Sequence, residues 1–168
     1  IGSGPARALA RKTKPLYENI GYRDESDKTV LVLETSKEPP ESVIHQILED
    51  CKVEPRKLIL ILAPTTSNVG STQVSGRIVE TGLHKLLKLG LDPKLAVNAH
   101  GSAPIAPVHK KFAEAMGRTN DAILYMGETR YEVKGMKETE LKQIVEKAPT
   151  SASPQYGRPY LQIVKEAK

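Results

Sequence analysis

The chain has 168 residues, enough for about one domain, and a formal net charge of +5 that comes from 25 Lys and Arg against 20 Asp and Glu. The basic residues are dispersed among acidic ones and aromatic residues make up only 4% of the chain, so the stripe of cations and rings typical of a nucleic-acid-binding surface is missing. Cys51 is the only cysteine and no apolar run approaches the ~20 residues of a membrane span, which excludes an internal disulfide and a thiolate metal cluster and leads us to expect a cytoplasmic protein.

The first part of the chain predicts two strands and one helix. Residues 1–28 are rich in glycine, proline and charge and predict a lead-in segment. Residues 29–34 have the pattern of an apolar strand, and residues 41–50, which follow two prolines, carry apolar side chains at helical spacing. The continuous apolar run within residues 57–63 predicts a second strand, buried on both faces of a sheet.

Residues 63–88 continue from this second strand, and we interpret them as the functional core of the chain. A loop rich in Thr, Ser and Gly leads into a helix predicted over residues 71–89, with Ser71 at or near its N-cap and Gly90 just beyond its end. A strand that feeds a helix N-terminus in this way presents backbone N–H groups to a ligand, although a loop that only caps the helix explains the same residues. The loop lacks the Gly-Lys-Ser/Thr ending of a triphosphate-binding loop, so we do not expect a nucleotide triphosphate there.

The second part of the chain predicts shorter elements. In order they are a strand at 94–98, a loop at 101–107, a helix at 108–116, strands at 119–126 and 129–134, a helix at 137–147, a linker at 151–159 and a last helix at 160–168. Strands and helices therefore alternate, which predicts a mixed αβ (α+β) fold, a layered sheet with helices packed on it. We expect one domain over residues 29–150, with the lead-in at 1–28 before it and the linker and short helix at 151–168 after it.

Six polar residues fall on one stripe of the helix predicted at 71–89, since each residue advances a helix by ~100°: Gln73, Arg77, Glu80, Thr81, His84 and Lys88. One interpretation is an ordinary solvated face on which Arg77 and Glu80 form an i, i+3 pair worth roughly 0.3 kcal/mol. The other is a cleft wall on which Glu80 activates water, because a neighbouring cation favours the ionised, proton-accepting form of a carboxylate. The four histidines share no metal-ligand spacing with one another or with the cysteine, so no metal site is predicted.

Four stretches together carry a family resemblance: GSGPARAL at 2–9, APTTSNVGSTQVSGRIVETGLHKL at 63–86, APIAPV at 103–108 and AMGRTNDAILY at 115–125. In this order they closely resemble the methenyltetrahydromethanopterin cyclohydrolases of one-carbon metabolism in methanogens and methylotrophic bacteria. The resemblance spans essentially the whole chain. Members of that family extend further on both sides and bind substrate in a crevice between two domains, so the chain resembles the middle half of such a protein.

The resemblance implies an enzyme that hydrolyses the methenyl bridge of 5,10-methenyltetrahydromethanopterin to the N5-formyl form without a metal or redox cofactor. The family's Arg-x-x-Glu pair matches Arg77 and Glu80, so Glu80 is expected to activate water and Arg77 to act as its electrostatic partner. Polar residues that lie in matching motifs are expected to contact the pterin substrate: Thr65, Ser67, Gln73, Asn120 and Asp121. The resemblance also implies a homo-oligomer, typically a trimer.

Two other functions stay open at the level of sequence. The chain is alternatively a truncated, non-catalytic fragment of such an enzyme that binds pterin or supports oligomerisation, because the family's flanking segments are not present in it. The third alternative is a basic domain that binds nucleic acid, against which the dispersed charge argues.

Overall fold

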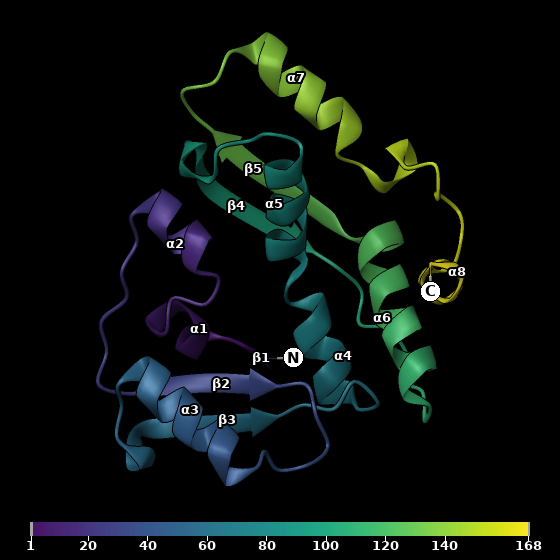
Figure 1. Ribbon diagram of the computed structural model, residues 1–168. Coiled ribbons are helices and arrows are strands. Elements are labelled where there is room, and N and C mark those ends of the chain that lie inside the picture. Colours follow the sequence, from purple (N-terminus) through teal and green to yellow (C-terminus); the bar gives the residue numbers. More distant parts are fainter. Residues whose placement is uncertain (1, 168) are drawn as a thin grey trace. The chain divides into compact units, whose positions relative to one another are not determined.

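The computed structural model describes residues 2–167, which fall into two compact units, the first ending at Pro64 and the second beginning at Thr65 (Figure 1). Each unit combines helices with a small sheet, so the predicted mixed αβ class is confirmed. The boundary between the units falls inside the domain expected over residues 29–150. In the described part of the chain, no helix is both long and apolar enough to cross a lipid bilayer.

A three-stranded sheet in the order β1, β2, β3 forms the centre of the first unit. Its elements are β1 (Gly2–Ser3), α1 (Pro5–Leu9), α2 (Lys14–Ile20), β2 (Thr29–Leu33), α3 (Glu41–Cys51), the 3-10 helix η1 (Pro55–Lys57) and β3 (Leu58–Leu62). Strand β1 is antiparallel to β2, whereas β2 and β3 run parallel. Helix α3 makes the crossover connection that two parallel strands require, which confirms the strand, helix and strand predicted for this part of the chain.

The core of the first unit lies on one face of its sheet. Side chains alternate between the two faces of a strand, and Leu31 of β2 packs with Ala6 of α1 and Cys51 of α3. Ile59 and Ile61 of β3 alternate with the residues that join this core, and they are 58% and 42% exposed. The prediction that this strand is buried on both faces is therefore wrong for the described chain, because α1 and α3 pack against the same face.

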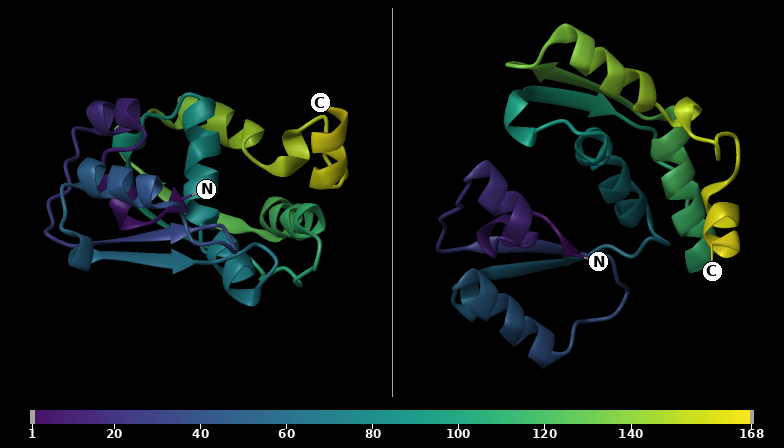
Figure 2. Two further views of the ribbon diagram at one scale, coloured as in Figure 1. Left: turned by 60° about the horizontal axis from the view of Figure 1, so that its bottom comes forward. Right: turned by 45° about the horizontal axis from the view of Figure 1, so that its top comes forward.

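The second unit is built on a two-stranded antiparallel sheet with helices packed against it. Its elements are α4 (Asn68–Ser75), α5 (Ile78–Lys88), η2 (Pro93–Leu95), β4 (Ala96–Ser102), α6 (Phe112–Met126), β5 (Glu128–Val133), α7 (Glu138–Lys147), η3 (Thr150–Ala152) and α8 (Tyr160–Glu166). Strands β4 and β5 pair with a bulge between Ala96 and Asn98. Helix α5 packs on both strands, and Figure 2 shows the two strands side by side and α6 next to α8.

Helix α5 joins the two apolar clusters of this unit. Val74 of α4, Ile78 of α5 and Ile123 of α6 form one cluster. Leu86 of α5 and Ile144 of α7 belong to the other. Residues eight positions apart point about 80° from each other around a helix, within one apolar stripe of roughly 100°, so one side of α5 is buried along its length and the other remains available for polar residues.

One predicted strand is wrong. Residues 119–126 form the second half of α6, in which Ala115, Thr119 and Ala122 are buried at the spacing of a helix. The short apolar run that suggests a strand is equally compatible with the inner face of a helix. By contrast, the strand predicted at 129–134 is confirmed as β5.

The predicted helix at 108–116 requires Gly117 to lie just beyond its end. Gly117 instead lies inside α6, so this predicted boundary is wrong. A Cβ atom added at Gly117 would lie 3.0 Å from the Cβ of Leu161 on α8. The glycine therefore allows α6 and α8 to approach each other closely, and α6 continues to Met126.

Candidate functional site

The hydroxyl-rich loop before α4 caps that helix through Ser67. Its Oγ accepts a hydrogen bond from the Gly70 amide at 3.1 Å, and its backbone is extended, as an N-cap requires. Ser71, expected at or near the N-cap, instead lies in the first turn of α4 and is 1% exposed. The helix thus begins earlier than predicted, and Ser71 has another role.

Ser71 and Ser75 attach α4 to the loop that precedes α6. The Ser71 hydroxyl donates to the Ala106 carbonyl at 2.6 Å, and the Ser75 hydroxyl donates to the Pro104 carbonyl at 2.8 Å. The prolines of this loop supply no N–H groups for regular pairing, and serine side chains satisfy the carbonyls of Pro104 and Ala106. Residues 103–107 are therefore an ordered connection held against α4, a role for the two serines that the sequence pattern does not reveal. The loop predicted over 101–107 begins too early, because Gly101 and Ser102 belong to β4 and pair with β5.

The helix predicted over 71–89 is interrupted at Arg77. Helix α4 ends at Ser75 and α5 begins at Ile78, with Arg77 at φ −92° and ψ 13° between them. The Arg77 amide donates to the Val74 carbonyl three residues back, whereas the Thr81 amide donates to the Arg77 carbonyl and begins the next helix. The continuous polar stripe is thus wrong as a geometric prediction, because its members lie on two helices.

Arg77 and Glu80 lie at the start of α5. Arg77 is the N-cap residue and is half-buried, and Glu80 is exposed in the first turn. The first N–H groups of a helix have no partner within it and interact favourably with negative charge, so the position suits a carboxylate. No ion pair joins the two side chains in the described chain, and the i, i+3 pair of an ordinary surface face is therefore not formed.

Tyr131 of β5 contacts the same turn of α5. Its hydroxyl donates to the Val79 carbonyl at 2.6 Å, and burial raises the pKa of the phenol. The ring reaches the helix beside Gly82, where a Cβ would collide with the Tyr131 hydroxyl. Sequence reasoning missed this contact; its one signal is a glycine inside a helical pattern, which costs about 1 kcal/mol relative to alanine and often has a packing reason.

Two further residues with predicted roles belong to the same segment. Thr65 is 2% exposed and lies two residues before Ser67, the N-cap of α4. Gln73 lies on α4, and its side-chain nitrogen is buried without a hydrogen-bond partner among the described residues. A buried amide donor left unpaired costs about 1 to 3 kcal/mol, so Gln73 is suited to donate to an acceptor on a ligand.

Asn120 and Asp121 lie in the middle of α6, whereas they were expected at the start of a strand. The Asn120 amide donates to the Met116 carbonyl at 2.8 Å, within its own helix. One carboxylate oxygen of Asp121 accepts from the backbone amide of Tyr160 at 2.8 Å and so caps α8. Helices α4 and α6 pack together, but these bonds direct Asn120 along its own helix and Asp121 toward α8.

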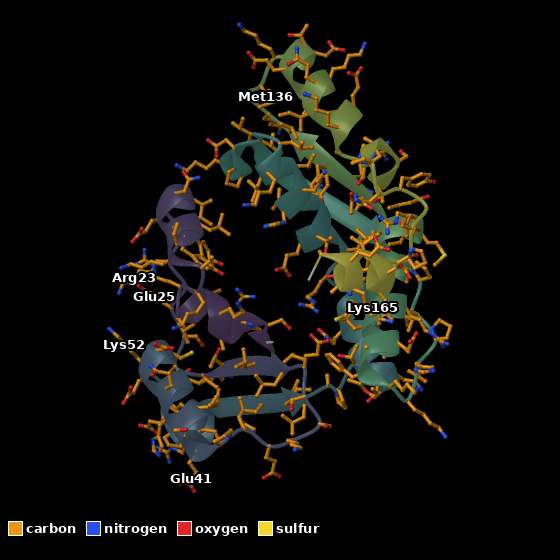
Figure 3. All side chains as sticks on the ribbon, turned by 45° about the vertical axis from the view of Figure 1, so that its right-hand side comes forward. Arg23, Glu25, Glu41, Lys52, Met136 and Lys165 are labelled. Atoms are coloured by element: carbon orange, nitrogen blue, oxygen red, sulfur yellow. The ribbon has the colours of Figure 1, made fainter. Side chains whose placement is uncertain are left out.

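A cavity of about 350 Å³ lies between α6 and α8. Glu114 and Arg118 of α6 and Lys165 of α8 contribute to its wall, and Figure 3 labels Lys165. Of the predicted site residues, its lining includes Asp121 and neither Arg77 nor Glu80. Within residues 2–167, no three His, Cys, Asp or Glu side chains are grouped as ligands for a metal ion.

Comparison with known proteins gives consistent results over the whole chain. A family model described as Cyclohydrolase (MCH) matches residues 1–168. Three similar proteins are named methenyltetrahydromethanopterin cyclohydrolase: that of Methanothermobacter marburgensis is 48% identical over 168 residues, that of Methanococcoides burtonii 47% over 167, and that of Methanocaldococcus jannaschii 45% over 168. Each alignment covers 99% of this chain and 52% of the relative, so the chain spans about half the length of the curated relatives it matches.

Proposed function

The chain belongs to the cyclohydrolase (MCH) family, and from this premise we propose that it hydrolyses the methenyl bridge of 5,10-methenyltetrahydromethanopterin to the N5-formyl form. The names of its relatives support the substrate and the reaction. The observation that carries the proposal is the placement of Glu80, exposed in the first turn of α5 and three residues after the half-buried Arg77. This is where the Arg-x-x-Glu pair of the family resemblance falls.

The chemistry requires one activated water molecule. The methenyl carbon lies between two nitrogens of a cationic amidinium group and is already electrophilic, so the enzyme has to position water and accept its proton. In the proposed step, water adds to that carbon and its proton passes to the Glu80 carboxylate. The hydroxyl group of the adduct then loses its proton as the carbonyl forms and the bond from the carbon to N10 breaks, N10 takes up a proton, and the formyl group stays on N5. Cation and water thus give the neutral formyl pterin and one proton.

Arg77 is proposed to orient this carboxylate and the water from the N-cap of α5. Gln73 is proposed to donate its buried amide to the pterin, and Thr65 and Ser67 to line the approach to α4. Asn120 and Asp121 complete the proposed contacts, although their hydrogen bonds lie within α6 and toward α8. The proposal includes no metal or redox cofactor, a cytoplasmic location and assembly into a homotrimer.

A second candidate function follows from the coverage of the relatives. Because the chain spans about half of their length, a module that binds pterin or supports oligomerisation without turnover is also consistent with the fold. The two candidates differ in whether this chain alone consumes the methenyl chromophore.

The deciding experiment follows the absorbance of methenyltetrahydromethanopterin in the presence of the chain. We expect turnover that Glu80→Gln lowers by about 100-fold or more, since loss of a general base typically costs a factor of that order. Glu146→Gln, which changes an exposed glutamate of α7, is the matched control and should keep full activity. Near-normal activity of Glu80→Gln contradicts the assigned base, whereas pterin binding without turnover by the wild-type chain supports the second candidate.

A further inference from the structure

The turn of α5 that carries Glu80 has few attachments of its own. Its N-cap residue Arg77 makes no capping hydrogen bond through its side chain. The first N–H groups of a helix also lack partners within it, so this turn depends on tertiary contacts for a fixed geometry. Ile78 supplies one of them, as a buried member of the cluster with Val74.

Tyr131 supplies a further contact, beside the packing of Val79 against the same cluster. Its hydroxyl donates at 2.6 Å to the carbonyl of Val79, the residue directly before Glu80, and the two partners are 52 residues apart in the chain. A hydrogen bond at this carbonyl fixes the peptide plane that joins Val79 to Glu80. A phenol keeps its proton at neutral pH and can donate, and burial raises the pKa of Tyr131 further.

The residues around this hydrogen bond leave room for the Tyr131 hydroxyl. Gly82 leaves the space that the tyrosine hydroxyl occupies, and a Cβ there would also approach the Thr129 Oγ1 to 3.0 Å. A glycine within a helix is otherwise unfavourable by about 1 kcal/mol. Gly82 on α5 therefore leaves the room that the Tyr131 hydroxyl on β5 requires.

We propose that Tyr131 is a positioning residue for the hydrolysis, which holds Glu80 in place through the Val79 carbonyl and so aligns its carboxylate with the attacking water. Tyr131 acts through the backbone and does not touch the reacting atoms. The inference rests on the function proposed above, because it assigns Tyr131 to the same base. A shift of about 1 Å in a catalytic group can lower a rate by a factor of up to ~100, so the loss of one such bond is measurable in kcat.

The test compares Tyr131→Phe with Tyr125→Phe. Tyr125 is a matched control in the same unit, since its half-buried hydroxyl donates to a backbone carbonyl, that of Arg158, at 2.5 Å. We expect Tyr131→Phe to lower kcat by about 10-fold with KM within about 2-fold, the pattern of an interaction that acts in the transition state. Tyr125→Phe should leave both constants unchanged.

Backbone amide exchange provides a readout that does not depend on catalysis. The Leu83 amide lies four residues after Val79 in α5 and interacts with the Tyr131 hydroxyl, so its exchange should quicken by roughly 5-fold in Tyr131→Phe alone. Unchanged exchange, or equal kcat in the two variants, overturns the inference. A wild-type chain without turnover instead overturns the proposed function, and the exchange of Leu83 then decides whether Tyr131 holds this turn at all.

Discussion

Replacing Ser71 by alanine tests whether the loop before α6 is held against α4 by buried serine hydroxyls. Ser71 is 1% exposed and Ala106 is 5% exposed, and the hydrogen bond between them is 2.6 Å long. Alanine fits the space of serine, so the substitution removes the bond without steric conflict and leaves a buried carbonyl without its donor. An unsatisfied buried group of this kind costs about 1 to 3 kcal/mol.

The cost should appear as a lower free energy of unfolding. In a unit of about 100 residues, each kcal/mol corresponds to a shift of roughly 4 to 8 °C in Tm, so Ser71→Ala should lower the Tm by at least ~4 °C. Thermal and urea unfolding followed by far-ultraviolet circular dichroism measure both quantities. The denaturant slope should stay the same, because the surface exposed on unfolding does not change.

Thr72→Ala is the matched control for this prediction. The Thr72 hydroxyl also donates to a carbonyl, that of Asn68 at 2.8 Å, but the bond is exposed and lies within one turn of α4. Its loss should change the free energy of unfolding by less than about 0.5 kcal/mol. If Ser71→Ala is no more destabilising than Thr72→Ala, the loop is not held by this hydrogen bond and the reasoning is refuted.

Two further predictions concern packing and pH. Gly127→Ala should destabilise the chain by about 1 to 3 kcal/mol, because a Cβ there would collide with Ile78; Gly76→Ala, with room for a Cβ, is the control in urea unfolding, and equal midpoints would contradict the packing argument. Lys57 donates to Asp27 at 2.6 Å and holds the pKa of that carboxyl below its usual range. The ion pair therefore stabilises the fold above the unfolded pKa of Asp27 and is lost as the pH falls through the lowered folded value, so the difference in unfolding free energy between wild type and Asp27→Asn should begin to fall near pH 4 and vanish only below the lowered folded pKa. A difference that persists in stronger acid would show that Asp27 contributes in another way.

Local patterns predict the first unit better than the second. The strands at 29–33 and 58–62 and the helix between them are marked by apolar periodicity and by prolines at their ends. Residues 119–126 are ambiguous by the same criteria, since a short apolar run is as compatible with a helix as with a strand. In the structure they belong to α6, which packs on both α4 and α8 and whose Gly117 contacts Leu161 of α8, and these contacts are not encoded in local spacing.

In the candidate site, too, some residues are predicted from local sequence and others are not. Arg77 and Glu80 are found from a short motif, because their spacing of three residues is visible in the chain. The roles of Ser71, Ser75 and Tyr131 depend on partners 29 to 52 residues away, so periodicity gives no access to them. The sequence therefore identifies the residues proposed to be catalytic. It does not identify the residues whose hydrogen bonds position the helices that carry them.

The break between α4 and α5 shows why that omission matters. No proline lies between residues 71 and 88, although Gly76, the C-cap of α4, favours an end there. In a continuous helix Glu80 would lie in the middle, where backbone N–H groups are already paired. The two helices are instead attached separately on either side of the break, α4 through Ser75 to Pro104 and α5 through Val79 to Tyr131. Glu80 consequently lies in the first turn of a helix, beside unpaired N–H groups that favour a negative charge. The tertiary contacts on either side of Gly76 therefore contribute to the electrostatic environment of the proposed base.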